Sequence, residues 1–207
     1  MRTGHSPHST MQHLNGNLLC AIDVETTGTL PGYHDLIQVA ILPLDAQIKP
    51  LKSAMPFYME LMPKRPENIQ EGANKVHRIV LAELMQRAIC PWKAADYFEE
   101  WFEKLRLPFG KRISPLAQNW PFDRGFMIDW LGEKSFADFI DSRYRDTMTA
   151  ALFENDRADF KNEKVPYPKV NLTYICSQLG VVNERAHDAL QDCIATAESY
   201  RRMILKS

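Results

Sequence analysis

The sequence predicts an α/β fold in which three early strands form an antiparallel meander and helices cover the sheet. Two observations support this prediction. Apolar runs of strand length come first in the chain, and later segments carry apolar residues at helical spacing. No internal repeat and no shift in composition interrupts this order, so we expect one α/β unit.

Composition indicates the class of protein. The 207 residues are 45% hydrophobic and 25% charged, which is typical of one folded domain or two small ones. No run approaches the roughly 18 to 20 consecutive apolar residues of a membrane span, so we expect no contact with a membrane. Because Lys+Arg 25 nearly balance Asp+Glu 26, any contact with nucleic acid must come from a local basic patch.

The cysteines and the N-terminal segment favour a cytoplasmic protein. No two of the four cysteines have the spacing of a zinc site, and we expect thiols in a reducing compartment. Residues 1–16 lack the central apolar block of a secretory signal. We therefore expect a flexible tail over residues 1–16 and a single domain over residues 17–207.

Four segments read as strands. Residues 18–24 are almost wholly apolar, which predicts a central strand that is covered on both faces. The runs at residues 36–44 and 57–62 follow at hairpin-like spacing and complete the meander. A further strand is expected at residues 113–117, because this short apolar run leads into a helical segment.

Helical spacing, with proline at starts and glycine at a stop, predicts the helices. They are expected over residues 91–105, from Pro121 onward, and over residues 147–153, 172–179 and 188–205. In the last of these, the apolar stripe is expected to comprise Leu190, Cys193, Ile194, Ala197, Tyr200 and Ile204.

Two carboxylates end the predicted central strand. Asp23 and Glu25 are two residues apart, so the strand period places both on one face of the sheet. Such a pair can bridge divalent cations, and carboxylates this close to a core need a partner or a metal. A solvated acidic strand end explains the pair equally well when it is taken alone.

A third acid, Asp123, lies where a predicted strand passes into a helix that begins at Pro121. In the first turn of that helix the macrodipole favours a carboxylate. A purely helix-stabilising aspartate is therefore a strong alternative to a role in catalysis.

The last helix carries a histidine and a further acid, His187 and Asp192. Five residues of regular helix turn by about 500°, so the two side chains converge only if His187 lies at or before the helix start. The residues that share a face with Asp192 are small, which allows the helix to approach the sheet: Ala189, Ala195, Thr196 and Ser199. The alternative is a polar helix start with Asp192 on a solvated flank.

Together, four acids and one histidine in this order resemble the DEDDh, or DnaQ-like, family of 3′-to-5′ exonucleases. Residues 23–28 match the first motif, residues 118–123 the second, and His187 with Asp192 the third. A linking pattern at residues 65–79 also resembles the family, except that Arg78 stands where glycine is common. The resemblance covers residues 17–205.

The resemblance implies a ribonuclease-H-like fold with a mixed five-stranded sheet, and two divalent cations, Mg²⁺ or Mn²⁺. Asp23, Glu25 and Asp192 would hold the ions directly and Asp123 through water, while His187 would be the general base. Histidine changes charge near neutral pH, which suits it to accept a proton from the attacking water. The residues implied in substrate binding are Thr26, Thr27, Gly28, His77, Ile79 and Asn119.

The function expected is therefore exonucleolytic hydrolysis of single-stranded nucleic acid from the 3′ end to nucleoside 5′-monophosphates, with DNA favoured and DNA repair or proofreading as the setting. One alternative is an RNA-trimming enzyme of the ribonuclease T or oligoribonuclease kind, because the same five residues ignore the 2′-hydroxyl. Another is a proofreading subunit that acts with a polymerase. Its candidate contacts are the tail, Trp92 and Trp101, although Trp101 is rather expected to pack in the core. A homodimer is also open, and an unrelated metal-dependent hydrolase is a remote third alternative.

One segment matches no motif. Residues 161–169 form a basic loop that contains Tyr167 and two prolines. A solvated connection and a surface that guides the nucleic-acid strand are equally good interpretations of this loop.

Overall fold

The computed structural model describes residues 12–13, 16–70, 72 and 79–206. Its strands are β1 (Gln12–His13), β2 (Asn17–Thr26), β3 (Leu36–Pro43), β4 (Phe57–Glu60), β5 (Ile113–Ala117) and β6 (Arg145–Asp146). Its helices are the short η3 (Pro66–Asn68), α2 (Leu81–Arg87), α3 (Pro91–Lys104), α4 (Trp120–Leu131), α5 (Glu133–Phe139), α6 (Thr147–Phe160), α7 (Leu172–Leu179) and α8 (Ala189–Lys206).

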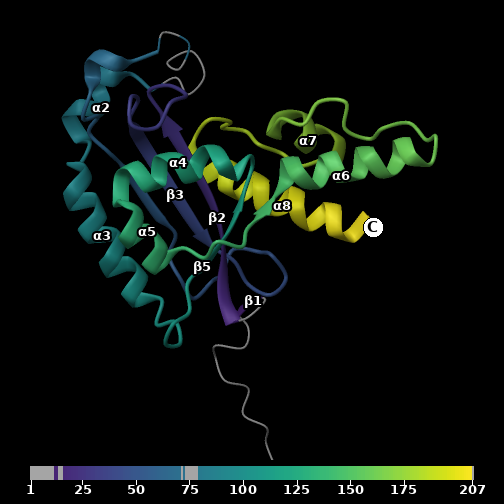
Figure 1. Ribbon diagram of the computed structural model, residues 1–207, viewed down its shortest axis with the longest axis horizontal. Coiled ribbons are helices and arrows are strands. Elements are labelled where there is room, and N and C mark those ends of the chain that lie inside the picture. Colours follow the sequence, from purple (N-terminus) through teal and green to yellow (C-terminus); the bar gives the residue numbers. More distant parts are fainter. Residues whose placement is uncertain (1–11, 14–15, 71, 73–78, 207) are drawn as a thin grey trace, which may run out of the picture.

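The sheet has the order β4-β3-β2-β5-β6, with β2 in the centre (Figure 1). β2 pairs antiparallel with β3 and parallel with β5, and β3 pairs antiparallel with β4. The mixed five-stranded sheet with an initial meander is thus confirmed. The two-residue β1 adds a further pairing to β2 at Gln12, inside the segment expected as a tail; residues 1–11 and 14–15 lie outside the described part of the chain.

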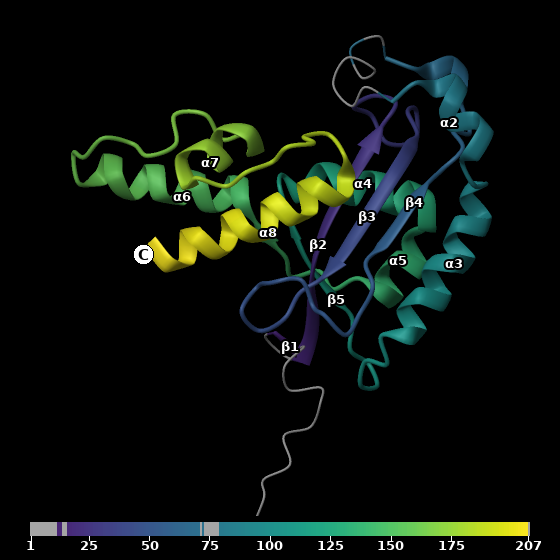
Figure 2. The ribbon, with the colours of Figure 1, turned by 180° about the vertical axis from the view of Figure 1, so that it is seen from behind.

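β2 is buried along both faces, as its continuous apolar run requires. Figures 1 and 2 show α3, α4 and α5 on one side of the sheet and α8 on the other. The side chains of β2 alternate between these two layers, so Leu18 and Ile22 contact the first and Leu19 and Ala21 the second. This alternation decides which layer meets the carboxylates at the end of the strand.

The layer formed by α3, α4 and α5 holds an aromatic core. Phe98 is fully buried, and its ring lies against those of Phe57, Trp101 and Trp130. Trp101 also donates its indole N–H to the carbonyl of Met55 at 2.8 Å, so it belongs to the core. Trp92 is 62% exposed, as a contact residue would require.

α8 packs on the sheet through small residues of its own. Ala189, Cys193 and Ala197 of α8 pack on Ala21 and Ala40 of the sheet. The expected stripe was wrong in part, since Ile194 and Ile204 are 39% and 49% exposed. The small side chains face the sheet because they allow the helix backbone to approach it closely.

The third cluster joins α6, α7 and the C-terminal half of α8, to one side of the sheet (Figure 1). α6 runs seven residues beyond its expected end at residue 153, because its second half is polar and has no apolar stripe to signal a helix. α2 and α5 were also not predicted, being short helices with a single buried residue each.

The four cysteines, Cys20, Cys90, Cys176 and Cys193, are free thiols, and all except Cys90 are buried. In the part of the chain that the structure describes, no helix combines the length and apolar character needed to cross a membrane.

Candidate active site

The carboxylates of β2 lie on the face that α8 covers. Asp23 and Glu25 share the strand parity of Ala21, which packs on α8. Glu25 is buried and Asp23 is partly exposed. A register shift between Glu25 and Thr26 interrupts the pairing with β3 directly after the two acids, so the regular part of the strand ends at Glu25.

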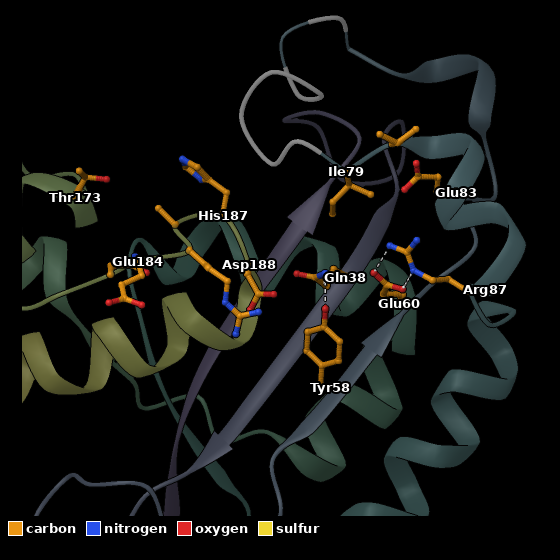
Figure 3. Close-up of a pocket in the computed structure, with 14 residues that line it drawn as sticks. Gln38, Tyr58, Glu60, Ile79, Glu83, Arg87, Thr173, Glu184, His187 and Asp188 are labelled. Carbon is orange, nitrogen blue, oxygen red and sulfur yellow. Dashed lines mark hydrogen bonds and ion pairs between the residues drawn. The ribbon is translucent and has the colours of Figure 1, made fainter.

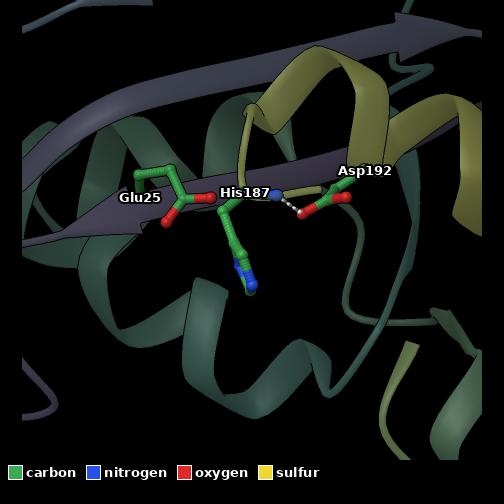
Figure 4. A group of neighbouring side chains, drawn as sticks. All are labelled: Glu25, His187 and Asp192. Atoms are coloured by element: carbon green, nitrogen blue, oxygen red, sulfur yellow. Dashed lines mark hydrogen bonds between the residues drawn. The ribbon is translucent and has the colours of Figure 1, made fainter. Parts of the chain in front are cut away.

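The third motif converges on the same place. His187 precedes α8 and has a left-handed backbone, with φ 71°. Its backbone N–H donates to Asp192 Oδ2 at 3.0 Å, which folds the turn back over the helix start. Ligand atoms of Glu25, His187 and Asp192 lie within 4.8 Å of one another (Figure 4). The condition that His187 lie before the helix is therefore met.

Asp123 reaches the site from the other layer. It lies in the first turn of α4, is 3% exposed, and accepts a hydrogen bond at 3.1 Å from the backbone N–H of Val24, the residue between Asp23 and Glu25. Asp146 anchors the start of α4, because its carboxylate accepts from Trp120 N at 2.6 Å. Asp123 therefore lies at a helix start and, at the same time, beside the acids of β2.

The four acids repel one another in a poorly solvated place. Burial, followed by the charges of Asp123, Glu25 and Asp192, raises the pKa of Asp23 well above its ordinary value. Burial and the charges of Asp192 and Asp123 raise the pKa of Glu25 to about 9. Burial likewise raises the pKa of Asp123 and of Asp192, although hydrogen bonds from neighbouring N–H groups oppose the shift.

This cluster fits divalent cations. Within the described residues, no lysine or arginine forms an ion pair with any of the four carboxylates. Among the described residues, the buried carboxylates thus lack a paired lysine or arginine, and the donors are oxygens with one imidazole. Such a donor set suits Mg²⁺ or Mn²⁺.

The residues of the first motif beyond Glu25 are fixed by the following loop. Thr27 exchanges two hydrogen bonds of 2.8 Å with Asp35, through its backbone N–H and its hydroxyl oxygen. Asp35 in turn accepts from Arg65 Nε at 2.9 Å, and Arg65 also pairs with Asp129 of α4. Arg65 thereby ties the Thr27 segment to α4.

Thr26 and Gly28 close the turn. The Thr26 hydroxyl donates to the carbonyl of Gly28 at 2.6 Å, and the ring of His34 packs so closely on Gly28 that a Cβ there would collide with it. His34 is held by accepting at Nδ1 from Leu30 N. Any other residue at position 28 would push His34 out of place.

The remaining predicted substrate residues are placed as follows. Asn119 precedes α4 with a left-handed backbone, φ 68°, and is half-buried. Ile79 lines a cavity of about 690 Å³ that also borders His187 (Figure 3). His77 and Arg78 lie outside the described residues.

The cavity reveals a residue that sequence reasoning missed. Gln38 of β3 is buried; its Oε1 accepts from Ala189 N, the first residue of α8, at 2.8 Å. Its Nε2 donates to the hydroxyl of Tyr58 at 2.7 Å. Gln38 lies between Glu25 and Glu60 in the sheet register. A buried glutamine in an apolar strand was the available signal, but its partner lies on a helix far along the chain.

Asn183 was also missed. Asn183 donates from Nδ2 to Asp192 Oδ1 at 2.6 Å, so both oxygens of Asp192 accept hydrogen bonds. Asp188 accepts from Gln191 N at 3.1 Å and caps α8, as expected of a polar helix start, but the solvated flank of the same alternative is wrong because Asp192 is buried.

Comparison with known proteins gives one family and one fold. The family model described as an exonuclease, RNase_T, matches residues 20–200. No curated protein sequence matches the chain significantly. Among solved structures, cell-death related nuclease 4 (CRN-4) is similar at TM-score 0.69 and 20% identity, with 91% of this chain and 64% of that chain covered.

Two further structures share the fold. Exonuclease I of E. coli, solved with a dA16 oligonucleotide, is similar at TM-score 0.71 and 18% identity, over 91% of this chain and 41% of that chain. The nuclease domain of 3′hExo, a DEDDh family member bound to rAMP, is similar at TM-score 0.66 and 17% identity, over 91% and 92%. The chain thus spans less than two thirds of CRN-4 and of exonuclease I. The expected ribonuclease-H-like fold is confirmed, and an unrelated fold is excluded.

Proposed function

Because the chain belongs to the RNase_T family of DEDDh exonucleases, we propose that it is a hydrolytic exonuclease, which removes nucleotides one at a time from the 3′ ends of single-stranded nucleic acid. The observation that carries this proposal is the convergence of Glu25, His187 and Asp192 within 4.8 Å, at the end of the strand that holds Asp23. The product would be a nucleoside 5′-monophosphate.

The acids would bind two divalent cations, Mg²⁺ or Mn²⁺. Asp23, Glu25 and Asp192 offer carboxylate oxygens directly, and Asp123 would contribute through water. Bound cations would stabilise the negative charge that develops on the attacking and leaving oxygens of the phosphodiester. The hydrogen bonds from Asn183 and from His187 N fix the orientation of the Asp192 carboxylate, so it need not reorganise when substrate arrives.

His187 would act as general base. Its side chain is exposed on a turn that is anchored through its own backbone N–H, so the imidazole is free to meet water beside the acids. Neither ring nitrogen is needed to hold the turn in place. The proton taken from the attacking water would pass from His187 to bulk solvent.

Thr26, Thr27, Gly28, Asn119, His77 and Ile79 are proposed to contact the terminal nucleotide. The first three lie in a loop that Asp35 and Arg65 hold in place, which favours a preformed site.

We favour DNA over RNA as the substrate. Exonuclease I was solved with DNA oligonucleotides and 3′hExo with rAMP, so proteins of this fold accept either sugar. RNA trimming is therefore the alternative, and only the contacts to the 2′-position distinguish the two.

The test is a time course on 5′-labelled single-stranded DNA and RNA of one sequence, with Mn²⁺ or with EDTA. A ladder that shortens from the 3′ end, requires Mn²⁺ and is lost in Asp23→Ala is expected. Asp96→Ala, which removes an acid of α3 outside the site, is the matched control and should retain full activity. If neither strand shortens in Mn²⁺, the chain does not act as an independent exonuclease, and co-purification with a polymerase becomes the next measurement.

A further inference from the structure

A second cavity, of about 320 Å³, lies in the arm formed by α6, α7 and the end of α8. Its lining includes two lysines, Lys164 and Lys206, and the aromatic residue Tyr174. Within the described residues that line it there is no carboxylate. Lys164 comes from the basic loop at 161–169, which the proposed chemistry leaves without a role.

The loop is a fixed surface. Asn155 of α6 donates to the carbonyl of Tyr167 at 2.7 Å and accepts from Tyr167 N at 2.8 Å. The Tyr167 side chain is buried against α6, α7 and α8. Two hydrogen bonds and a buried ring therefore fix the loop backbone at Tyr167, three residues from Lys164, before any ligand binds.

The loop is also connected by a hydrogen bond to the second motif of the acid site, by which we mean Asp23, Glu25, Asp123 and Asp192. At its end, the carbonyl of Val170 accepts from Gln118 Nε2 at 2.7 Å, and Gln118 is the neighbour of Asn119 in the second motif. In α7, Thr173 lines the cavity beside His187, whereas the next residue, Tyr174, lines the second cavity, which holds Lys164 and Lys206. The two cavities therefore lie on two sides of one helical turn, with Thr173 facing the first (Figure 3).

Charge favours a polyanion as the occupant. The acid site concentrates carboxylates that repel phosphate unless cations are bound, whereas the residues at 161–169 comprise three lysines and one glutamate. Lys164 and Lys206 are exposed. Exposed lysines bind backbone phosphates, and a half-exposed tyrosine provides a face on which any base can stack.

We propose that the surface formed by Lys164, Tyr174 and Lys206 binds the single-stranded nucleic acid a few nucleotides upstream of the scissile phosphate. This rests on the exonuclease function proposed above. A helix with its side chains is about 10–12 Å wide. At a stacked rise of about 3.4 Å per nucleotide, roughly three to four nucleotides cross α7 from one cavity to the other. A dinucleotide is then too short to reach the surface.

The test compares a dinucleotide with an oligothymidylate of about twelve nucleotides, for the wild type and for K164E/K206E. The expected result is a rise of about tenfold in the ratio of KM for the long substrate to KM for the dinucleotide. The log–log salt dependence of binding should also lose about 1.4 from its slope, because each single-strand phosphate contact contributes about 0.7. K52E/K134E makes the same charge change at exposed lysines that line neither cavity, and should change neither quantity.

Substitution of the tyrosine separates stacking from charge. Tyr174→Ala should weaken binding of the oligothymidylate by about five- to tenfold, and Tyr174→Phe should restore it, since phenylalanine also stacks. Equal affinity of Tyr174→Ala and the wild type for the oligothymidylate would show that Tyr174 does not contact the nucleic acid.

Binding is measured by fluorescence anisotropy in EDTA, so that it does not depend on turnover. If the wild type hydrolyses neither substrate, the proposed function is wrong, but the anisotropy still shows whether the surface binds nucleic acid. If the wild type hydrolyses both and K164E/K206E binds the oligothymidylate as tightly as K52E/K134E does, the surface does not bind nucleic acid. A protein that binds the wild type but not K164E/K206E would then mark it as a protein-binding site instead.

Discussion

The two faces of the central sheet differ in the size of their side chains and in what they do. On the face covered by α3, α4 and α5, Phe57, Phe98 and Trp130 fill a broad aromatic core. On the other face no aromatic ring of the described residues is fully buried, and α8 contributes only the small Ala189, Cys193 and Ala197, which pack on alanines and leucines of the strands. Large side chains supply burial and therefore stability, whereas small ones bring acids from two elements within reach of one another.

The largest effect is expected on the face covered by α8, when the proposed general base is removed. His187→Asn keeps a residue that tolerates the left-handed backbone at this position, so only the imidazole is lost. We expect turnover to fall by about 10² to 10⁴ with the melting temperature nearly unchanged, because the side chain is exposed. Binding of Mn²⁺, measured by titration calorimetry, should persist. Unchanged turnover would exclude His187 from the mechanism.

The second prediction addresses the aromatic face. Phe98→Ala removes a fully buried ring with four aromatic neighbours, and should lower the free energy of unfolding by about 3–5 kcal/mol. Phe160→Ala is the control, since Phe160 is 90% exposed and should cost less than about 0.5 kcal/mol. Denaturant unfolding measures both, and turnover per folded Phe98→Ala molecule should remain near that of the wild type.

The third prediction concerns the cost of gathering the acids. The folded-state pKa of Glu25, about 9, lies above its ordinary value of 4.5, so in this interval the folded state holds a proton that the unfolded state releases. Stability without metal should therefore fall as pH rises from 4.5 to about 9, by at most about 1.4 kcal/mol per pH unit for this group.

Glu25→Gln should remove that part of the slope and stabilise the metal-free protein at pH 8 but not below pH 4.5. Thermal melts in EDTA across this range measure the difference. Glu60→Gln is the matched control, because Glu60 lies in the same sheet row but pairs with Arg87. A Glu25→Gln variant that is less stable than the wild type at pH 8 would contradict the electrostatic strain described above.

The smallest effect is expected at Gln38, which links the sheet to the start of α8. Gln38→Leu deprives the buried N–H of Ala189 of its acceptor, which should cost about 1–3 kcal/mol of stability. Tyr58→Phe removes only the outer hydrogen bond to Gln38 and should cost about 0.5–1.5 kcal/mol. Chemical denaturation ranks the two, and the reverse order would show that the tyrosine, not the glutamine, holds the helix start.

Local sequence patterns were enough to predict where each acid lies on its own strand or helix. The strand period placed Asp23 and Glu25 on one face, and the helix period required His187 to precede α8; the register and φ 71° at His187 agree with both. Small residues beside Asp192 indicated a close approach of α8 to the sheet; of these, Ala189 packs on the sheet, whereas Ser199 lies against Cys176 of α7. These features depend on local geometry, which neighbouring residues encode.

The distant groups that support those acids, in contrast, became evident only from the fold. The contacts of Gln38 with Ala189 and of Arg65 with Asp35 and Asp129 join segments far apart in the chain, and no local period predicts them. The same holds for Gln118 and Val170, which fix the basic loop beside the second motif. Such pairings arise when packed layers bring polar groups together and burial requires each to find a partner.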